Sequence, residues 1–318
     1  MELPEKIFDV LVVGELNVDL ILNHLGQFPQ VGKEVIARQM IFTLGSSSAI
    51  FASNLSVLGS RVAFCGRVGR DSFAGKILGD LGKKGVDTSF ILHSDSLDTG
   101  ISVALNVSED RAMVTYPGAM SELSAAEVTD AMLGTAKHLH VSSVFLQPAL
   151  QPGLTDLFAR ARALGLTTSL DPQWDPAEQW QLNWKRLLPD VHVFLPNQAE
   201  LEQIEAACSR GPQQAAVRDL PGCTVVKKGR AGAELWAQGG MLSQPAFLNR
   251  EVVDAIGAGD SFDAGFIHSF VQGSPPADCL WFGALCGAIN TTAAGGTTAF
   301  QDYDTVRRIA RNTFNFQL

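Results

Sequence analysis

The feature that most constrains this chain of 318 residues is a regular alternation of short apolar runs and helical segments after residue 124. The apolar runs have the length of buried strands, and glycines or polar turns separate them from stretches with helical periodicity. This alternation predicts a mostly parallel sheet covered by helices on both faces, which is a three-layer α/β/α fold. We expect strands at 138–141, 167–170, 191–195, 223–227 and 232–237, and helices from a capping box at Ser124–Glu127 and at 152–164, 177–188, 197–207, 260–271, 276–294 and 304–312.

The first 120 residues contain extended segments that do not fit this alternation. A strand at 8–13, a strand at 61–65 and helices at 47–58 and 72–84 continue the α/β pattern. The remaining extended segments are separated by glycine, proline and polar turns. We interpret them as a small β lid, about 15–44 and 97–119, inserted into a single domain that spans residues 1–318.

Composition excludes several classes of protein. Hydrophobic residues make up 46% and charged residues 18%, which is typical of an ordered globular protein. The formal net charge is -9, and no block of five or more basic residues is present, so we expect no nucleic-acid partner. No apolar stretch is long enough to cross a membrane. The five cysteines have no metal-ligand spacing, and together with an N-terminus unlike a signal peptide they favour a cytoplasmic protein.

The strongest chemical signal is the stretch from Asp254 to Phe262, which precedes a long apolar helix. Gly257 and Gly259 permit a tight turn, and the first amides of the helix are then free to bind an anion. A carboxylate such as Asp260 repels a phosphate at this place. Its presence makes sense if it accepts the proton of a hydroxyl that attacks the phosphate. The alternative is that Asp260 only caps the helix.

Other polar residues follow predicted strands. Asn17 and Asp19 come after the first buried strand, at the sheet edge where ligands of α/β proteins usually bind, and they offer donors and acceptors for a polyol. Asn197 and Glu200 have the spacing of a helix N-cap and its capping-box partner. Lys227 follows a strand, where it either contacts nucleotide phosphates or is a solvated surface lysine.

Together these motifs resemble the ribokinase and phosphofructokinase-B (PfkB) family of sugar and nucleoside kinases. Residues 254–262 look like the C-terminal signature of that family, and Gly14-Glu15-Leu16-Asn17-Val18-Asp19 is similar to the end of its first strand. Further matches follow in the same order along nearly the whole chain, at 66–75, 99–100, 116–119, 171–180, 196–200 and 227–232.

The resemblance implies a ribokinase-like fold and transfer of the γ-phosphoryl group of ATP to a hydroxyl of a small sugar or sugar-like substrate. It implies Asp260 as general base beside the amides of Gly257, Ala258 and Gly259. It also implies Mg²⁺ bound through waters near Asn197 and Glu200, K⁺ on backbone carbonyls near Asp254 and Ile256, and a homodimer formed through the lid. The remaining implied positions are the substrate residues Asn17, Asp19, Gly45, Ser46 and Ile50, and the nucleotide residues Asn197, Glu200, Lys227, Gly229 and Gly232.

The chain departs from the family pattern before the first helix. Ser46 replaces the second glycine of a pair, and Ile50 stands where the family has an asparagine that commonly contacts the acceptor. An aliphatic side chain cannot pair with a buried hydroxyl, and an unpaired polar group costs about 1–3 kcal/mol. The sequence therefore argues against ribose binding in the familiar way. The hydroxyls of Ser46–Ser48 either recover a contact or bind an anionic substituent, and the sequence leaves both readings open.

Two other functions fit the same residues. A nucleoside kinase would use the same machinery, and a non-catalytic sugar or nucleotide sensor would keep the fold without turnover. Other nucleotide-binding and hydrolytic classes fit worse, because the sequence contains no P-loop, no G-x-G-x-x-G after the first strand and no G-x-S-x-G elbow.

Overall fold

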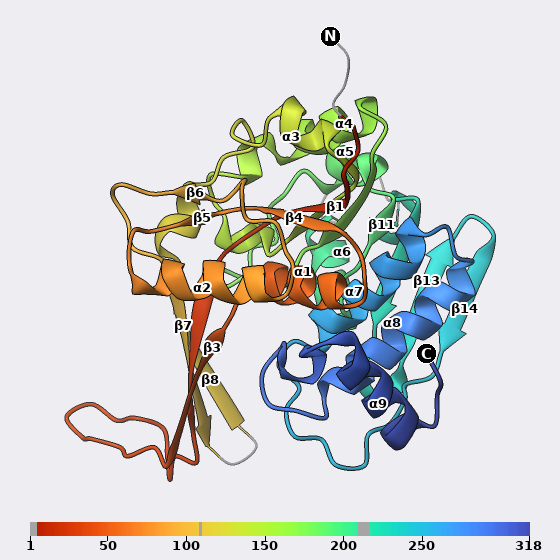
Figure 1. The fold of residues 1–318 in the computed structure, drawn as a ribbon. Helices are drawn as coiled ribbons and strands as arrows, with labels where there is room; N and C mark the ends of the chain where they lie inside the picture. Colours follow the sequence, from red (N-terminus) through yellow and green to blue (C-terminus); the bar gives the residue numbers. More distant parts are fainter. Residues whose placement is uncertain (1–4, 108–109, 209–215) are drawn as a thin grey trace.

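A central sheet of eight strands organises the computed structural model, which describes residues 5–107, 110–208 and 216–318 (Figure 1). Six neighbouring strands are parallel, and the two at one edge are antiparallel hairpin additions. In spatial order the strands are β14 (Gly240–Gln244), β13 (Ala233–Ala237), β12 (Cys223–Lys227), β11 (Val193–Phe194), β10 (Thr167–Asp171), β9 (Ala136–Ser142), β1 (Phe8–Val13) and β4 (Val62–Cys65).

Helices cover both faces of this sheet, because successive side chains of each strand point to opposite faces. Val10 and Val12 belong to the core on one face, and Leu11 and Val13 belong to the core on the other. The first face carries α1 (Ser47–Val57), α2 (Ser72–Lys83), α7 (Ala258–Val271) and α8 (Pro276–Asn290), and the second carries α3 (Asp130–Gly134), α4 (Leu154–Ala163), α5 (Trp184–Leu187) and α6 (Gln198–Cys208). The predicted three-layer α/β/α fold is confirmed.

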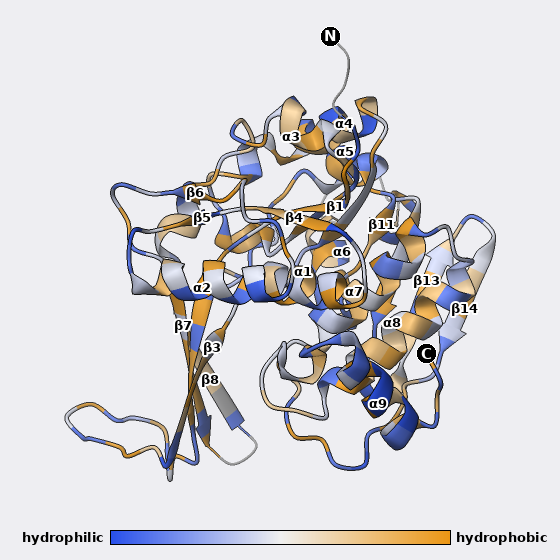
Figure 2. Ribbon diagram, viewed as in Figure 1, coloured by the Kyte–Doolittle hydropathy of each residue, from blue (hydrophilic) through white to orange (hydrophobic). Residues whose placement is uncertain are grey.

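The outermost helix is α9 (Tyr303–Phe314), which packs against α8. Figure 2 shows that α9 is mostly hydrophilic, and Val306 and Ala310 are its buried residues. Among the described residues, no helix combines the length and apolar character needed to cross a bilayer.

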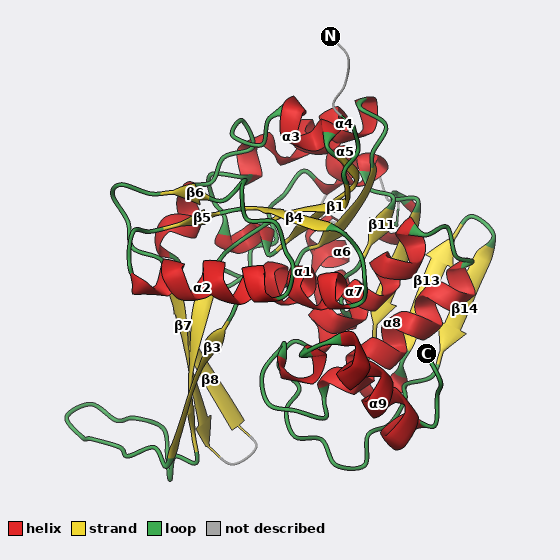
Figure 3. Cartoon of the chain, in the orientation of Figure 1, coloured by secondary structure: helices red, strands yellow, loops and turns green. Residues whose placement is uncertain are grey.

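A second sheet of four strands projects away from the central one, below α2 in the view of Figure 3. Its order is β3 (Gln39–Leu44), β2 (Asn17–Asn23), β7 (Gly100–Val107) and β8 (Asp110–Tyr116). Cross-strand register places Asp19 beside Thr43 and Ser102, and Ser102 beside Thr115, so one face is polar near the body of the molecule. The short strands β5 (Arg67–Val68) and β6 (Leu92–His93) form a separate parallel pair.

The helix predicted at 177–188 is wrong. Only α5, at its end, is helical, and the preceding residues form an irregular loop. The buried carboxylate of Asp175 accepts the backbone N–H groups of Ala177, Gln179 and Trp180 at 2.9, 2.8 and 2.7 Å. Such local bonds from an aspartate compete with helical hydrogen bonds, which is the reason for the irregular path.

Of the capping box predicted at Ser124 only the half made by the Glu127 side chain is present, since the Glu127 amide donates to the Ser124 carbonyl, and the helix predicted to follow is absent. The backbone N–H and the hydroxyl of Ser124 donate to Glu127 Oε2 at 2.9 and 3.0 Å. Glu127 is also paired with Arg67 of β5. The helix α3 begins later, after Thr129, whose hydroxyl accepts the amide of Met132.

Candidate active site

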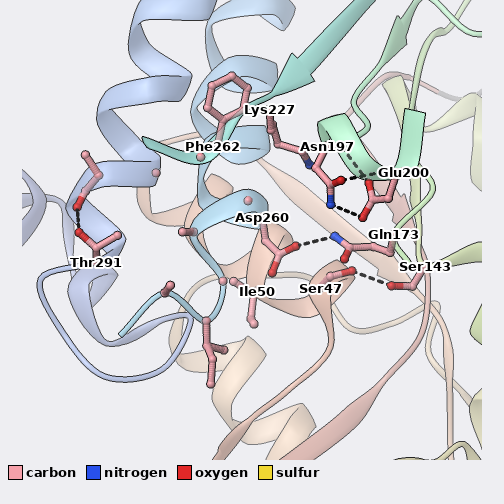
Figure 4. A pocket seen from close by; sticks show the side chains of 18 of the residues that line it. Ser47, Ile50, Ser143, Gln173, Asn197, Glu200, Lys227, Asp260, Phe262 and Thr291 are labelled. Carbon is pink, nitrogen blue, oxygen red and sulfur yellow. Dashed lines mark hydrogen bonds between the residues drawn. The ribbon is translucent and has the colours of Figure 1, made fainter. Parts of the chain in front are cut away.

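A cavity of about 860 Å³ lies between the second sheet, the N-terminus of α7 and the loops that follow the central strands (Figure 4). Ligands of open α/β sheets bind at the carboxyl ends of the strands, which is where this cavity opens. We call the part lined by β2, β7, β8, residues 14–16 and the start of α1 the acceptor end. The cavity brings together the predicted residues Asn17, Asp19, Ser46, Ile50, Asn197, Glu200, Lys227, Gly229, Gly232, Ile256, Gly257, Ala258, Gly259 and Asp260.

Two predicted residues, Gly45 and Asp254, lie behind the cavity wall. A Cβ at Gly45 would collide with Asp19 Oδ1, so the glycine lets that carboxylate approach the backbone. Asp254 accepts the amide of Ile256 through one oxygen and the amide of Gly295 through the other, both at 2.9 Å. It therefore holds the loop before α7 against the loop after α8. The Ile256 carbonyl accepts the side-chain amide of Asn290, and K⁺ binding at this loop stays a prediction.

The N-terminus of α7 provides an anion site. Gly257 has a φ of 77°, and a Cβ there would lie 2.5 Å from the Cα of Gly296, so glycine is required for two independent reasons. The amides of Gly259 and Asp260 lie in the first turn of α7, where backbone N–H groups have no acceptor within the helix. The amide of Ala258 donates to the Ala255 carbonyl at 3.2 Å. Of the amides of Gly257, Ala258 and Gly259 that we expected at this site, that of Ala258 thus already has an acceptor.

Asp260 reaches the cavity from the first turn of α7 and is only 8% exposed. Its Oδ1 accepts a hydrogen bond of 3.0 Å from Nε2 of Gln173, as Figure 4 shows. Burial raises the pKa of Asp260 to about 8, with further upward contributions from Asp171, Glu15 and Glu200 that outweigh the opposing charge of Lys227. A carboxyl with this pKa exchanges a proton near neutral pH, as a general base must.

Lys227 is buried and paired with acidic side chains rather than exposed to solvent. Its Nζ lies 2.9 Å from Asp171 Oδ2 and 2.8 Å from Asp263 Oδ2, and its side chain is largely buried. Nε2 of Gln173 also donates to Asp171 Oδ2, at 2.8 Å. The alternative of a solvated surface lysine is wrong, because the side chain is largely buried against Asp171 and Asp263. Lys227 also lines the cavity, so its role toward nucleotide phosphates stays a prediction. The chain of contacts runs from Lys227 through Asp171 and Gln173 to Asp260.

The two carboxyls beside Lys227 titrate differently. Burial works to raise the pKa of Asp171, but the charge of Lys227 and a hydrogen bond from Asp263 lower it overall. Burial raises the pKa of Asp263 well above its usual range against the effect of Lys227, and Asp171 adds to that rise. These directions favour the ionised form at Asp171 and the protonated form at Asp263.

Asn197 and Glu200 form a complete capping box at the start of α6. Asn197 Oδ1 accepts the amide of Glu200 at 2.9 Å, and Glu200 accepts the amide and the Nδ2 of Asn197 at 2.8 and 2.6 Å. Burial raises the pKa of Glu200 to about 7, with a further rise from Asp171. The pair therefore caps α6 as the sequence predicted. Both side chains also line the cavity, and their role toward Mg²⁺ stays a prediction.

The acceptor end is lined mainly by hydroxyls and carboxyls. Nδ2 of Asn17 donates to Asp19 Oδ1 at 2.9 Å and to Ser102 Oγ at 3.2 Å. Ser102 Oγ is 2.9 Å from Thr115 Oγ1, which continues the polar row across the second sheet. Ile50 is buried beneath this end and packs against Gly296, beside the anion site.

The buried carboxyl of Glu15 organises the opposite wall. Its Oε1 accepts from Ser47 Oγ at 3.1 Å and from the amide of Ser48 at 3.3 Å, and its other oxygen accepts from the hydroxyl of Ser48. Ser47 Oγ is also 2.8 Å from Ser143 Oγ, as drawn in Figure 4. Ser46 donates to the backbone carbonyl of Glu15 at 2.6 Å and caps α1 by accepting the amide of Ala49.

Sequence reasoning missed Glu15, Ser143 and Asp263 as site residues. Glu15 belongs to the motif at 14–19, in which only Asn17 and Asp19 were predicted to bind the substrate. Ser143 directly follows β9, so its place at the carboxyl end of a parallel strand was a usable signal. Asp263 lies one helical turn after Asp260, and this spacing places both side chains on one side of α7.

The architecture defines the general class. The chain superposes on Arabidopsis thaliana ribokinase complexed with ribose and ATP with a TM-score of 0.77, at 22% identity, covering 95% of this chain and 98% of that one. It superposes on Burkholderia thailandensis nucleoside kinase in complex with inosine with a TM-score of 0.80, at 18% identity, covering 97% and 98%. The fold is therefore that of ribokinase-like α/β proteins.

The particular family follows from the sequence. The model of the pfkB family carbohydrate kinases matches residues 8–302, and the chain belongs to this family. It is 30% identical to 2-dehydro-3-deoxygluconokinase of Bacillus subtilis over 275 residues, which is 79% of this chain and 82% of that protein. The resemblance seen in the ordered motifs is thereby confirmed, and the protein is a carbohydrate kinase.

The unequal titration of the two carboxyls beneath the site gives a stability prediction. We expect Asp171→Asn to destabilise the protein by about 3–5 kcal/mol, because it leaves the buried ammonium of Lys227 without its ionised partner. Asp263→Asn removes a group that is already protonated, so we expect a change below about 1 kcal/mol. Urea unfolding of the two isosteric variants measures both values. Equal losses in the two variants would refute this assignment of the charge.

Proposed function

We propose that this kinase transfers the γ-phosphoryl group of ATP to a hydroxyl of a small sugar or sugar-like acceptor, with Asp260 as general base. The observation that carries the proposal is the buried carboxyl of Asp260 with its pKa raised to about 8, directly beside the amides at the start of α7. The polar acceptor end lies in the same cavity. Base, anion site and polyol-binding side chains are the parts that phosphoryl transfer to an alcohol requires.

The proposed step follows from these positions. Gln173 occupies Oδ1 of Asp260, which leaves Oδ2 to accept the proton of the acceptor hydroxyl. The hydroxyl oxygen forms a bond to the γ-phosphorus while the bond to the β–γ bridging oxygen breaks, and ADP leaves. The amides of Gly257, Gly259 and Asp260 stabilise charge on the moving group.

The residues present fit a divalent cation bound with the nucleotide. Asn197 and Glu200 bring oxygen atoms, the hard ligands that Mg²⁺ prefers, to the cavity. Mg²⁺, when bound, neutralises phosphate charge and orients the phosphates. Gly229 and Gly232 line the nucleotide end of the cavity with positive φ values, and a Cβ at Gly232 would collide with the Gln244 carbonyl.

We interpret the second sheet as a lid on a single kinase domain. Its polar face, with Asn17, Ser102 and Thr115, already forms one wall of the cavity. Movement of this sheet toward α7 would exclude water from the acceptor and so limit hydrolysis of ATP. The lid segments that we propose are about 15–44 and 97–119.

A nucleoside is the second candidate acceptor. Ala104, Met113 and Leu146 line the cavity beside the polar side chains, which gives a nucleobase an apolar surface. A structural neighbour of this chain is a nucleoside kinase bound to inosine. The same catalytic residues would serve either acceptor, so a substrate panel distinguishes the two.

The first functional prediction concerns Asp260→Asn. With Mg²⁺ and K⁺ present, we expect the wild-type protein to release ADP from ATP when it is given one pool of sugars or nucleosides. In the variant we expect kcat to fall at least about a hundredfold. Binding of the acceptor should survive, because asparagine keeps the size of the side chain and one oxygen that accepts hydrogen bonds. If both proteins are inactive on every pool while one compound raises the melting temperature, the protein is a sensor.

The second functional prediction is a pH profile. The base must be deprotonated to accept a proton, so kcat/KM should rise with pH, reach half its maximum near the Asp260 pKa of about 8 and level off above it. The same measurement on Asp260→Asn should give a residual rate without this rise. A wild-type profile that is flat from pH 6 to 9 would argue against Asp260 as the base.

We also propose that two copies pair through the outer face of the lid. This face alternates with the polar one and is apolar on β3 and β8, where Met40 is 65% and Val114 is 67% exposed. Phe42 and Tyr116 extend the same surface. Contiguous exposed apolar side chains mark interaction sites, and both edges of this sheet have unpaired backbone groups.

The dimer proposal predicts different effects of one charge at two exposed methionines. Met40→Asp should convert a dimer to a monomer in light scattering after size exclusion, because it buries a carboxylate in an apolar interface. Met241→Asp places the same charge on β14, where the side chain is 48% exposed, and should leave the dimer intact. A monomeric wild-type protein at micromolar concentration would rule the proposal out.

A further inference from the structure

A buried polar network lies behind the anion site. Its three members, Asn54, Ser261 and Asn290, come from α1, α7 and α8, and each is fully buried. Asn54 Nδ2 donates to Ser261 Oγ at 2.9 Å, and this hydroxyl donates to Asn290 Oδ1 at 3.0 Å. The two bonds join α7, just after Asp260, to the helices on either side of it. These three side chains do not line the cavity, so the proposed reaction does not use them directly.

Both ends of the network hold backbone carbonyls of the loops around the anion site. Nδ2 of Asn290 donates to the carbonyl of Ile256 at 2.6 Å. Nδ2 of Asn54 donates to the carbonyl of Gly296 at 2.9 Å. Ile256 directly precedes Gly257, and a Cβ on Gly257 would lie 2.5 Å from the Cα of Gly296, so the two loops touch. Two side-chain amides therefore fix the loop before α7 and the loop after α8.

The helix α1 contacts the loop after α8 in a second way. Ile50 lies one turn before Asn54, and residues with this spacing share one face of a helix. A Cβ on Gly296 would collide with Ile50, so this apolar side chain packs tightly against the loop. Ile50 and Ser47 also line the cavity. One face of α1 thus extends from the acceptor end to the back of the anion site.

The position of Asn54 is unfavourable if it serves only to fill the core. Most of its neighbours on α1, such as Phe51 and Leu55, are buried and apolar. Its Oδ1 is buried and accepts no hydrogen bond from the part of the chain that the structure describes. A buried acceptor without a partner costs free energy that an apolar side chain would not. This cost is accounted for if the amide is needed to hold the carbonyl of Gly296.

We propose that Asn54, Ser261 and Asn290 are positioning residues for the anion site, which keep the amides at the start of α7 directed at the transferred phosphoryl group. This inference rests on the proposed kinase function and adds three residues to it. An anion site works through dipoles that are oriented before the charge arrives, so displacement of these amides weakens it. Loss of the network should therefore weaken binding of phosphate groups and slow their transfer.

The first test measures binding with Ser261→Ala, which removes the hydroxyl that joins Asn54 to Asn290. Calorimetric titration with Mg²⁺ and a constant K⁺ concentration gives the affinity for a non-hydrolysable ATP analogue and for adenosine, which has no phosphate. We expect the variant to bind the analogue at least about tenfold more weakly and adenosine within about twofold of the wild-type protein. Equal losses for the two ligands, or an unchanged affinity for the analogue, overturn the proposal.

Matched controls come from two serines outside the network. Ser269 lies about two turns after Ser261 on the same helix and is 8% exposed. Ser53 precedes Asn54 on α1, and its buried Oγ has no hydrogen-bond partner in the described part of the chain. Ser269→Ala and Ser53→Ala should both keep the two affinities within about twofold. Asn54→Ala should show the same selective loss as Ser261→Ala, and wild-type affinity for the analogue in folded Asn54→Ala contradicts the proposal.

Kinetics separate this inference from the kinase proposal. In Ser261→Ala we expect kcat to fall at least about tenfold while the KM of the acceptor changes by less than about twofold. A lower melting temperature with unchanged kcat and unchanged affinities would show that the network is only structural, and would refute the inference while sustaining the kinase. If the wild-type protein has no turnover, the kinase is refuted, and selective loss of binding of the analogue in the variant still sustains the role of the network in binding anions.

Discussion

The ion pair between Lys227 and Asp171 is the interaction on which the candidate site depends. It joins the ends of β12 and β10, and the second contact of Lys227, with Asp263, reaches α7. Since Gln173 bonds to both Asp171 and Asp260, the ion pair also orients the proposed base. A buried charge pair is a weak source of stability, but breaking one is expensive. The main effect of the pair is thus to fix the position of Asp260 and the charges that surround it.

Burial of the pair is accompanied by burial of the neighbouring carboxyls, which shifts their pKa values. Burial and nearby negative charges raise the pKa values of Asp260 and Glu200, and the single buried ammonium of Lys227 only partly offsets this. The backbone amides at the start of α7 offset part of this negative charge when a phosphate binds beside them.

This arrangement explains how one family fold can serve different acceptors. The anion site and the base lie on α7, whereas the acceptor end is built from the lid, the loop after β1 and the start of α1. Replacements in the serine run change the acceptor end, whereas Ile50 lies between this end and the anion site, against Gly257 and Gly296. A relative that is 30% identical is a 2-dehydro-3-deoxygluconokinase.

The sequence by itself determined the α/β fold, the family and most members of the site, because strand and helix periodicity and the motif at 254–262 are local patterns. It did not determine the loop at 177–183, where one buried aspartate, Asp175, overrides helical propensity. Only the tertiary structure decided that Lys227 is paired beneath the site and that the serines of α1 serve Glu15. These partners lie dozens of residues apart or more, and the energy of a buried charge depends on which groups folding brings beside it.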